Sequence, residues 1–237
     1  TAFRGFGGPQ AMFVMESALF YSGDKMGIPL EELQEINLLS EGDELPFGMK
    51  LQRCNAKLCW DELFSRYNIE QKINEIDKFN IRNDRYKRTY ALMPVCFGIS
   101  FTNTMLNQAR ALVNVYLDGS VGVSTGAIEM GQGVNQKITD IVSSTFSIPE
   151  EKIKLETTNT TRVANTSATA ASTGSDLNGK AAQLACRQIL DRLYRVAAEL
   201  LDAASPADLR IRDGVFYNNG GRTELTWDKA VNEAYLR

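Results

Sequence analysis

The sequence predicts an α+β fold, a layered mixed sheet with helices packed on it and a helical N-terminal part. Residues 1–88 carry apolar side chains mostly at helical spacing, whereas residues 89–237 alternate strand-like stretches, turn signals and amphipathic stretches. Hairpins mixed with helices on one face are typical of layered α+β proteins rather than of doubly wound parallel sheets. We therefore expect one domain-sized chain, 1–237, with a mainly helical lobe at 1–88 and an α+β lobe at 89–237.

Four helices are expected in the N-terminal part. Pro9 begins a helix that Gly27 ends, because proline suits a first helical turn and glycine a C-cap. Pro29, followed by two glutamates, starts a second, short helix. A third helix covers 59–67. The stripe of Ile69, Ile73, Ile76 and Phe79, with charges between its members, predicts a surface helix packed on a core.

The C-terminal part is read as strands, hairpins and helices. Residues that favour strands occupy positions 90–102. Asp118-Gly119, a strong hairpin signal, lies between two further strand-like stretches at 109–117 and 121–124. A helix over 131–146 and a strand over 153–158 follow. A long amphipathic helix, marked by apolar positions from 177 to 200, is expected to be capped by Ser175 or Asp176. Residues 211–221 predict another hairpin, and 227–236 the start of a helix.

The composition excludes several classes of function. The chain has no histidine, so it contains no histidine-dependent triad, HExxH zinc site or imidazole base. A net charge of −3 argues against nucleic-acid binding, and 43% hydrophobic residues argue against disorder. Membrane-length apolar runs and a signal peptide are absent, so we expect a cytoplasmic protein with no membrane partner. The four cysteines lack CxxC spacing and are expected to be free and buried.

Four segments carry chemical information, each with two interpretations. Glycine-rich 3–10 (FRGFGGPQ) lets a ligand approach the backbone or simply turns the chain tightly. The turn 129–133 (EMGQG) offers helix N-terminal amides to an anion or is an ordinary strand-to-helix turn. Residues 157–175, rich in Thr, Ser, Asn and Ala, form an exposed loop or surround a polar ligand with amides and hydroxyls. Residues 97–102 (FGISFT) end a strand whose aromatic faces the core, the favoured reading, or a pocket.

Taken together and in this order, the four segments resemble the molybdopterin-binding region of the xanthine dehydrogenase family. The matching stretches are FRGFGGPQ, FGISFT, EMGQG and ANTSATAASTGSDLNGKA, supported by CWDEL at 59–63 and LNQARALVNVYLDGSV at 106–121. The resemblance runs from Thr1 to about residue 190. Ala127-Ile128 and Asn135 depart from the Gly-Thr and His of many relatives, and these positions flank the cofactor motif.

The resemblance implies a role for each matching position. Arg4 and Ala171 would lie near the molybdenum, which has no direct protein ligand. Phe6 and Phe101 would hold a flat heteroaromatic substrate, with Thr102 as a polar contact. The expected cofactor-binding residues are Arg4, Gly131, Gln132, Gly133, Ala170, Ala171 and Ser172.

The same resemblance implies oxidative hydroxylation of purines, hypoxanthine or xanthine to urate, with water as oxygen source. The chain begins without Met and stops inside a helical pattern, so we expect it to be part of a longer homodimeric or hetero-oligomeric enzyme. Its glutamate base is then expected beyond Arg237, and iron–sulfur clusters and FAD on other segments or chains, which leaves this segment inactive alone. The alternatives are an aldehyde oxidase or N-heterocycle hydroxylase of the same family, and a non-catalytic binding or subunit module.

Overall fold

The computed structural model describes residues 4–156, 158–163 and 166–237. It forms two compact units, an N-terminal unit (Thr1–Gly98) and a C-terminal unit (Ile99–Arg237), and each is described by itself. The described ranges contain seven α-helices and two three-stranded sheets, one mixed and one antiparallel. This confirms the α+β class.

The helices of the N-terminal unit begin and end close to where the sequence predicts. They are α1 (Gly8–Met26), α2 (Leu30–Ile36), α3 (Ala56–Tyr67) and α4 (Ile69–Arg82). Pro9 lies in the first turn of α1, and Gly27 ends that helix in the left-handed conformation at φ 67°. The apolar stripe of α4 is only half-buried, whereas Trp60 of α3 is buried. The unit thus has a small apolar core.

One predicted element of this region is wrong. Residues 90–102, all of them described, form no strand. Side chains bind the backbone of this stretch and of the residues before it instead of a neighbouring strand. The Gln34 side-chain amide donates to the Leu92 carbonyl at 2.8 Å, and Asn80 accepts from the Arg88 amide at 2.8 Å. Residues that favour strands form one only where a partner strand is available.

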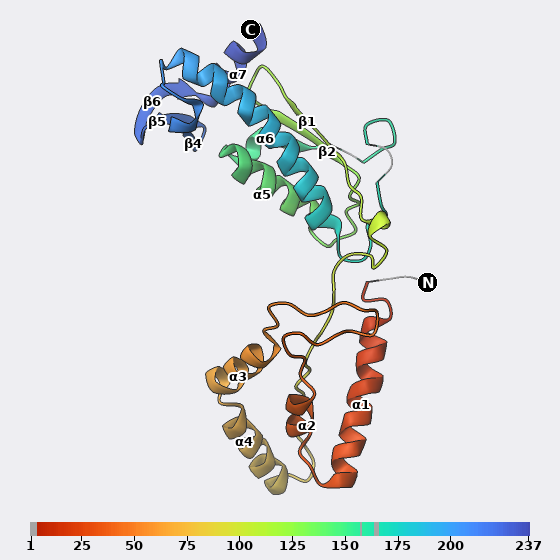
Figure 1. Cartoon of the computed structure of the whole chain (residues 1–237). Helices are drawn as coiled ribbons and strands as arrows, with labels where there is room; N and C mark the ends of the chain where they lie inside the picture. Colours follow the sequence, from red (N-terminus) through yellow and green to blue (C-terminus); the bar gives the residue numbers. More distant parts are fainter. Residues whose placement is uncertain (1–3, 157, 164–165) are drawn as a thin grey trace. The chain divides into compact units, whose positions relative to one another are not determined.

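The C-terminal unit opens with a mixed sheet. It consists of β1 (Ala111–Val115), β2 (Val121–Thr125) and β3 (Ile153–Leu155), with β1–β2 antiparallel and β2–β3 parallel. The β1–β2 turn lies at Asp118-Gly119, which confirms the predicted hairpin. Helices α5 (Val134–Phe146) and α6 (Gly174–Leu200) pack on each other, and α6 also contacts β1 and β2 (Figure 1).

A second, antiparallel sheet follows α6. Its strands are β4 (Leu209–Arg212), β5 (Val215–Asn218) and β6 (Gly221–Thr226), and α7 (Trp227–Leu236) comes directly after them. The predicted hairpin over 211–221 is confirmed. The core of the unit lies where α5, α6, α7 and the sheets meet. Trp227 is almost completely buried and packs on Phe146, with ring centroids 5.0 Å apart.

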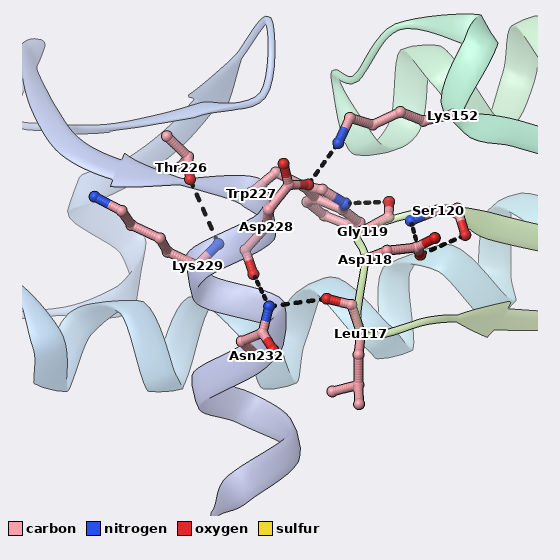
Figure 2. Close-up of polar contacts among 10 residues, drawn as sticks. All are labelled: Leu117, Asp118, Gly119, Ser120, Lys152, Thr226, Trp227, Asp228, Lys229 and Asn232. Atoms are coloured by element: carbon pink, nitrogen blue, oxygen red, sulfur yellow. Dashed lines mark hydrogen bonds and ion pairs between the residues drawn. The ribbon is translucent and has the colours of Figure 1, made fainter.

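Polar contacts attach α7 to the β1–β2 turn (Figure 2). The Trp227 indole donates to the Gly119 carbonyl at 2.8 Å, and the Asn232 side chain donates to the Leu117 carbonyl at 2.8 Å. Lys152 forms an ion pair with Asp228 at 2.5 Å. A short turn between two strands is therefore fixed by residues near the end of the chain.

Two smaller predictions need correction. The N-cap of α6 is Thr173, and Ser175 and Asp176 lie inside the first turn because the helix already begins at Gly174. The four cysteines are free, as predicted, but only Cys186 is buried. None of the helices in the described ranges is long and apolar enough to cross a membrane.

Candidate functional site

The Glu129–Gly133 turn is closed by its own carboxylate. Glu129 accepts hydrogen bonds from the amides of Gly131 at 2.8 Å, Gly133 at 3.0 Å and Asn135 at 2.9 Å. These amide donors hold the pKa of Glu129 below its usual range, those of Asn135 and Gly133 contributing most. Gly131 and Gly133 have φ of 91° and 77°, which a side chain would oppose. The amides expected to bind a cofactor are thus bonded to Glu129 in this structure.

Gln132 folds back over the same turn. Its side-chain nitrogen donates to the Ile128 carbonyl at 2.8 Å, and its side-chain oxygen accepts from the Met130 amide. The turn is exposed at Glu129 and half-buried at Gln132. A primary amide in this position has further lone-pair and N–H capacity for a polar ligand.

The turn before α6 presents unused backbone donors. Ala171 and Ser172 have φ of 51° and 55°, a left-handed conformation that costs non-glycine residues about 1–3 kcal/mol each. Within the described part of the chain, no acceptor is recorded for either amide N–H. The N-cap residue of α6, Thr173, makes no capping bond and instead donates its hydroxyl to the Ala170 carbonyl at 2.9 Å. Free amides at the positive end of a 27-residue helix suit an anionic, oxygen-rich ligand.

The segment that contains Phe101 and Thr102 is bonded to this turn. The Ser100 amide donates to the Ala171 carbonyl at 2.9 Å. From the other side, the Ile128 amide donates to the Thr169 hydroxyl at 3.0 Å. These two bonds place the Phe101 segment, the Ala170–Ser172 turn and the start of the Gln132 turn next to one another. These three neighbouring segments carry eight of the expected site residues, Phe101, Thr102, Gly131, Gln132, Gly133, Ala170, Ala171 and Ser172.

Arg4 and Phe6 belong to the N-terminal unit. Both are exposed, and Phe6 is 71% exposed. Gly5 and Gly7, on either side of Phe6, have φ of 71° and 84°, so the segment turns sharply before α1. A Cβ on Gly8 would clash with the Phe97 ring, so a side chain at this position would displace the ring. Contact of Arg4 and Phe6 with a ligand stays a prediction.

One residue of this region carries no signal in the sequence. Asn107 bonds both backbone groups of Phe101 through its side-chain amide, at 2.9 Å and 2.8 Å. An asparagine six residues after an aromatic is an ordinary turn residue, so its role emerges only once the loop is folded. Two surface hollows, of about 440 Å³ between α5 and α6 and 580 Å³ beside α7, contain none of the candidate residues.

An α+β unit whose described residues give no acceptor to the amides of Ala171 and Ser172, at the start of a long helix and beside a glycine turn, has the features of a domain that holds a large anionic cofactor. Residues 62–237 match the Molybdopterin cofactor-binding domain, and the chain belongs to that family. Within it, the chain is a molybdopterin-binding segment homologous to xanthine dehydrogenase.

The chain is similar over most of its length to two xanthine dehydrogenases and to one solved structure. The chain is 47% identical over 193 residues to xanthine dehydrogenase/oxidase of Gallus gallus, which covers 81% of this chain and 14% of that protein. It is 44% identical over 198 residues to xanthine dehydrogenase of Oryza sativa subsp. japonica, covering 84% and 14%. The crystal structure of quinoline 2-oxidoreductase from Pseudomonas putida 86 superposes with a TM-score of 0.70 at 17% identity, covering 94% of this chain and 30% of that one. The chain thus spans about 14% of the length of the curated relatives it matches.

Proposed function

We propose that this chain forms part of the cofactor and substrate site of an enzyme that hydroxylates purines, converting hypoxanthine and xanthine to urate with water as oxygen source. The observation that carries the proposal is the bonding of the Phe101–Thr102 segment to the Ala171 turn. It joins the backbone next to Phe101 to the turn that contains the Ala171 and Ser172 amides, which supports neighbouring places for a flat substrate and an anionic cofactor. The 47% identity to a xanthine dehydrogenase/oxidase supports the purine substrate.

In this proposal, the residues of the chain bind and orient the cofactor and the substrate. Molybdopterin, when bound, supplies the two-electron oxidation chemistry. The amides of Ala171 and Ser172 donate to it, and Gln132 holds it by its side-chain amide. Arg4 and Ala171 lie near the molybdenum without ligating it. The remaining cofactor contacts come from Ala170, Gly131 and Gly133. The amides of the two glycines can bind the cofactor only after Glu129 has released them.

The substrate contacts are also assigned. Phe6 and Phe101 hold a flat heteroaromatic ring, one by stacking and one by its edge, and the Thr102 hydroxyl makes a polar contact. No residue of this chain acts as the base, and a glutamate beyond Arg237 takes that role. Iron–sulfur clusters and FAD belong to other segments or chains of a cytoplasmic homodimeric or hetero-oligomeric enzyme of purine catabolism.

The test uses the full-length enzyme that contains this chain. We expect stoichiometric molybdenum and turnover of xanthine, and we expect Arg4→Ala and Gln132→Ala to lower either molybdenum content or turnover. Gln136→Ala is the matched control for Gln132→Ala, because Gln136 lies four residues further on, in the first turn of α5, and bonds Asp140 and Glu150 outside the site. Unchanged molybdenum and turnover in both site variants would refute the site assignment.

Substrate choice separates the enzyme classes. A site in which Phe101 holds the substrate ring suits purines and other flat N-heterocycles, so we expect xanthine to be a better substrate than benzaldehyde. Preference for benzaldehyde would favour an aldehyde oxidase. If the full-length protein contains no molybdenum, the remaining function is that of a non-catalytic binding or subunit module.

A further inference from the structure

Asn107 holds the backbone of Phe101 from both sides. Its side-chain oxygen accepts from the Phe101 amide at 2.9 Å, and its side-chain nitrogen donates to the Phe101 carbonyl at 2.8 Å. Both lengths are typical of well-formed hydrogen bonds. One primary amide thereby takes the part that the peptide group of a neighbouring β-strand would take, although residues 90–102 form no strand. Both residues are half-buried, which limits competition from water.

The neighbouring residues fasten the same loop to the cofactor side of the site. The Ser167 amide donates to the Gln108 carbonyl at 3.0 Å, and the Gln108 amide donates to the Ser167 hydroxyl at 3.1 Å. Together with the bond from Ser100 to Ala171, these contacts tie the loop at both ends to residues 167–171. The two ends of the loop, Ser100 and Gln108, are thus bonded to residues 167–171. Just inside these ends, Phe101 and Asn107 are bonded to each other across the loop.

We propose that Asn107 is a positioning residue of the substrate site, which sets the place of the Phe101 ring relative to the Ala171 turn. The proposal rests on the proposed function, in which Phe101 contacts a heteroaromatic substrate. Without Asn107, both backbone groups of Phe101 lose their protein partner and the loop samples other conformations. Apparent affinity is then the intrinsic affinity multiplied by the fraction of molecules that keep the ring in place. Substrate binding is therefore affected, while the cofactor amides of Ala171 and Ser172 are left intact.

The test compares Asn107→Ala with Asn103→Ala in the full-length enzyme. Asn103 is a matched control, because its side chain accepts from the Met105 amide in the same loop, whereas the hydrogen bonds of the Phe101 backbone are with Asn107. We expect Asn107→Ala to raise KM for xanthine about tenfold with molybdenum content unchanged, and Asn103→Ala to change KM less than twofold. Asn107→Asp, similar in size, keeps the acceptor but loses the donor and serves if the alanine variant fails to fold.

Two further measurements make the result specific. Hydrogen exchange at the Phe101 amide should be faster in Asn107→Ala than in the wild type, and unchanged in Asn103→Ala. In a Phe101→Ala background, Asn107→Ala should raise KM no further, because the ring that it positions is already gone.

The outcomes separate this inference from the proposed function. An enzyme that turns over xanthine but has the same KM and Phe101 exchange after the Asn107 substitutions overturns the inference alone. Additive effects of the Asn107 and Phe101 substitutions, or a loss of molybdenum in Asn107→Ala, overturn it as well. A wild-type enzyme without molybdenum or heteroaromatic turnover overturns both proposals.

Discussion

Gly119 lies at the contact between the β1–β2 turn and α7, where an added methyl group has no room. Its φ is 76°, and a Cβ built there would lie 1.9 Å from the Asp228 carboxylate oxygen and 3.1 Å from Cδ1 of Trp227. Figure 2 shows both side chains beside the turn. Gly119→Ala must therefore move Asp228 or Trp227, or shift the turn itself.

The expected loss of stability follows from the contacts that give way. The left-handed conformation costs an alanine about 1–2 kcal/mol. Moving Asp228 weakens its partly exposed ion pair with Lys152, worth about 0–1 kcal/mol. Moving Trp227 weakens its indole hydrogen bond to the Gly119 carbonyl, worth about 0.5–1.5 kcal/mol. We expect Gly119→Ala to lower the free energy of unfolding by about 3 kcal/mol.

The assay is urea unfolding of the 237-residue chain, followed by Trp227 fluorescence in a Trp60→Phe background. Gly220→Ala is the control, because Gly220 has φ 83° but no atom within 4 Å of its built Cβ, so it measures the conformational cost alone. Asp228→Ala should recover part of the loss in Gly119→Ala. Equal losses for Gly119→Ala and Gly220→Ala would refute the steric reasoning.

Three further predictions concern single residues. Glu129→Gln should destabilise the chain at neutral pH. The difference from the wild type should vanish as acid protonates wild-type Glu129, because a carboxylate with a lowered pKa stabilises the fold only while it is ionised. Thermal melts at a series of pH values test this, and a stability difference that does not depend on pH would contradict it. Burial raises the pKa of the Cys186 thiol to about 12, so a thiol reagent at pH 8 should modify exposed Cys59 and spare Cys186 until the chain unfolds, as read by peptide mass spectrometry. Ala171→Gly should keep or raise stability by up to about 1 kcal/mol, whereas Ala171→Val should lower it, because a β-branched residue resists φ 51°; equal unfolding midpoints would count against strain at this turn.

Local signals made much of the fold predictable. Pro9 and Gly27 mark the two ends of α1, and Asp118-Gly119 marks the β1–β2 turn, because each depends on the backbone preference of one or two residues. The α4 stripe was likewise readable from its spacing. These elements need no information about the rest of the chain.

The failures depend on partners distant in sequence. Residues 90–102 carry strand-forming side chains but receive their hydrogen bonds from side chains such as Gln34, 58 residues away from Leu92. The predicted α6 cap, Ser175 or Asp176, lies two or three residues after the observed cap, because Thr173 and Gly174 are typical loop residues in the sequence. Motif resemblance predicts that Phe101 is a site residue, whereas its hydrogen bonds with Asn107 depend on a loop conformation that no spacing rule encodes.

The bond between Trp227 and Gly119 also constrains how the chain is made. Its partners are separated by 108 residues. At a synthesis rate of about 5–20 residues per second, the β1–β2 turn emerges about 5–20 s before the tryptophan that fixes it. During that interval Phe146 lacks its buried aromatic neighbour, and the nascent hairpin presents apolar surface to the ribosome exit and to chaperones. The C-terminal unit can complete its core only after α7 has been synthesised, so premature termination before Trp227 should yield an aggregation-prone product rather than a smaller folded one.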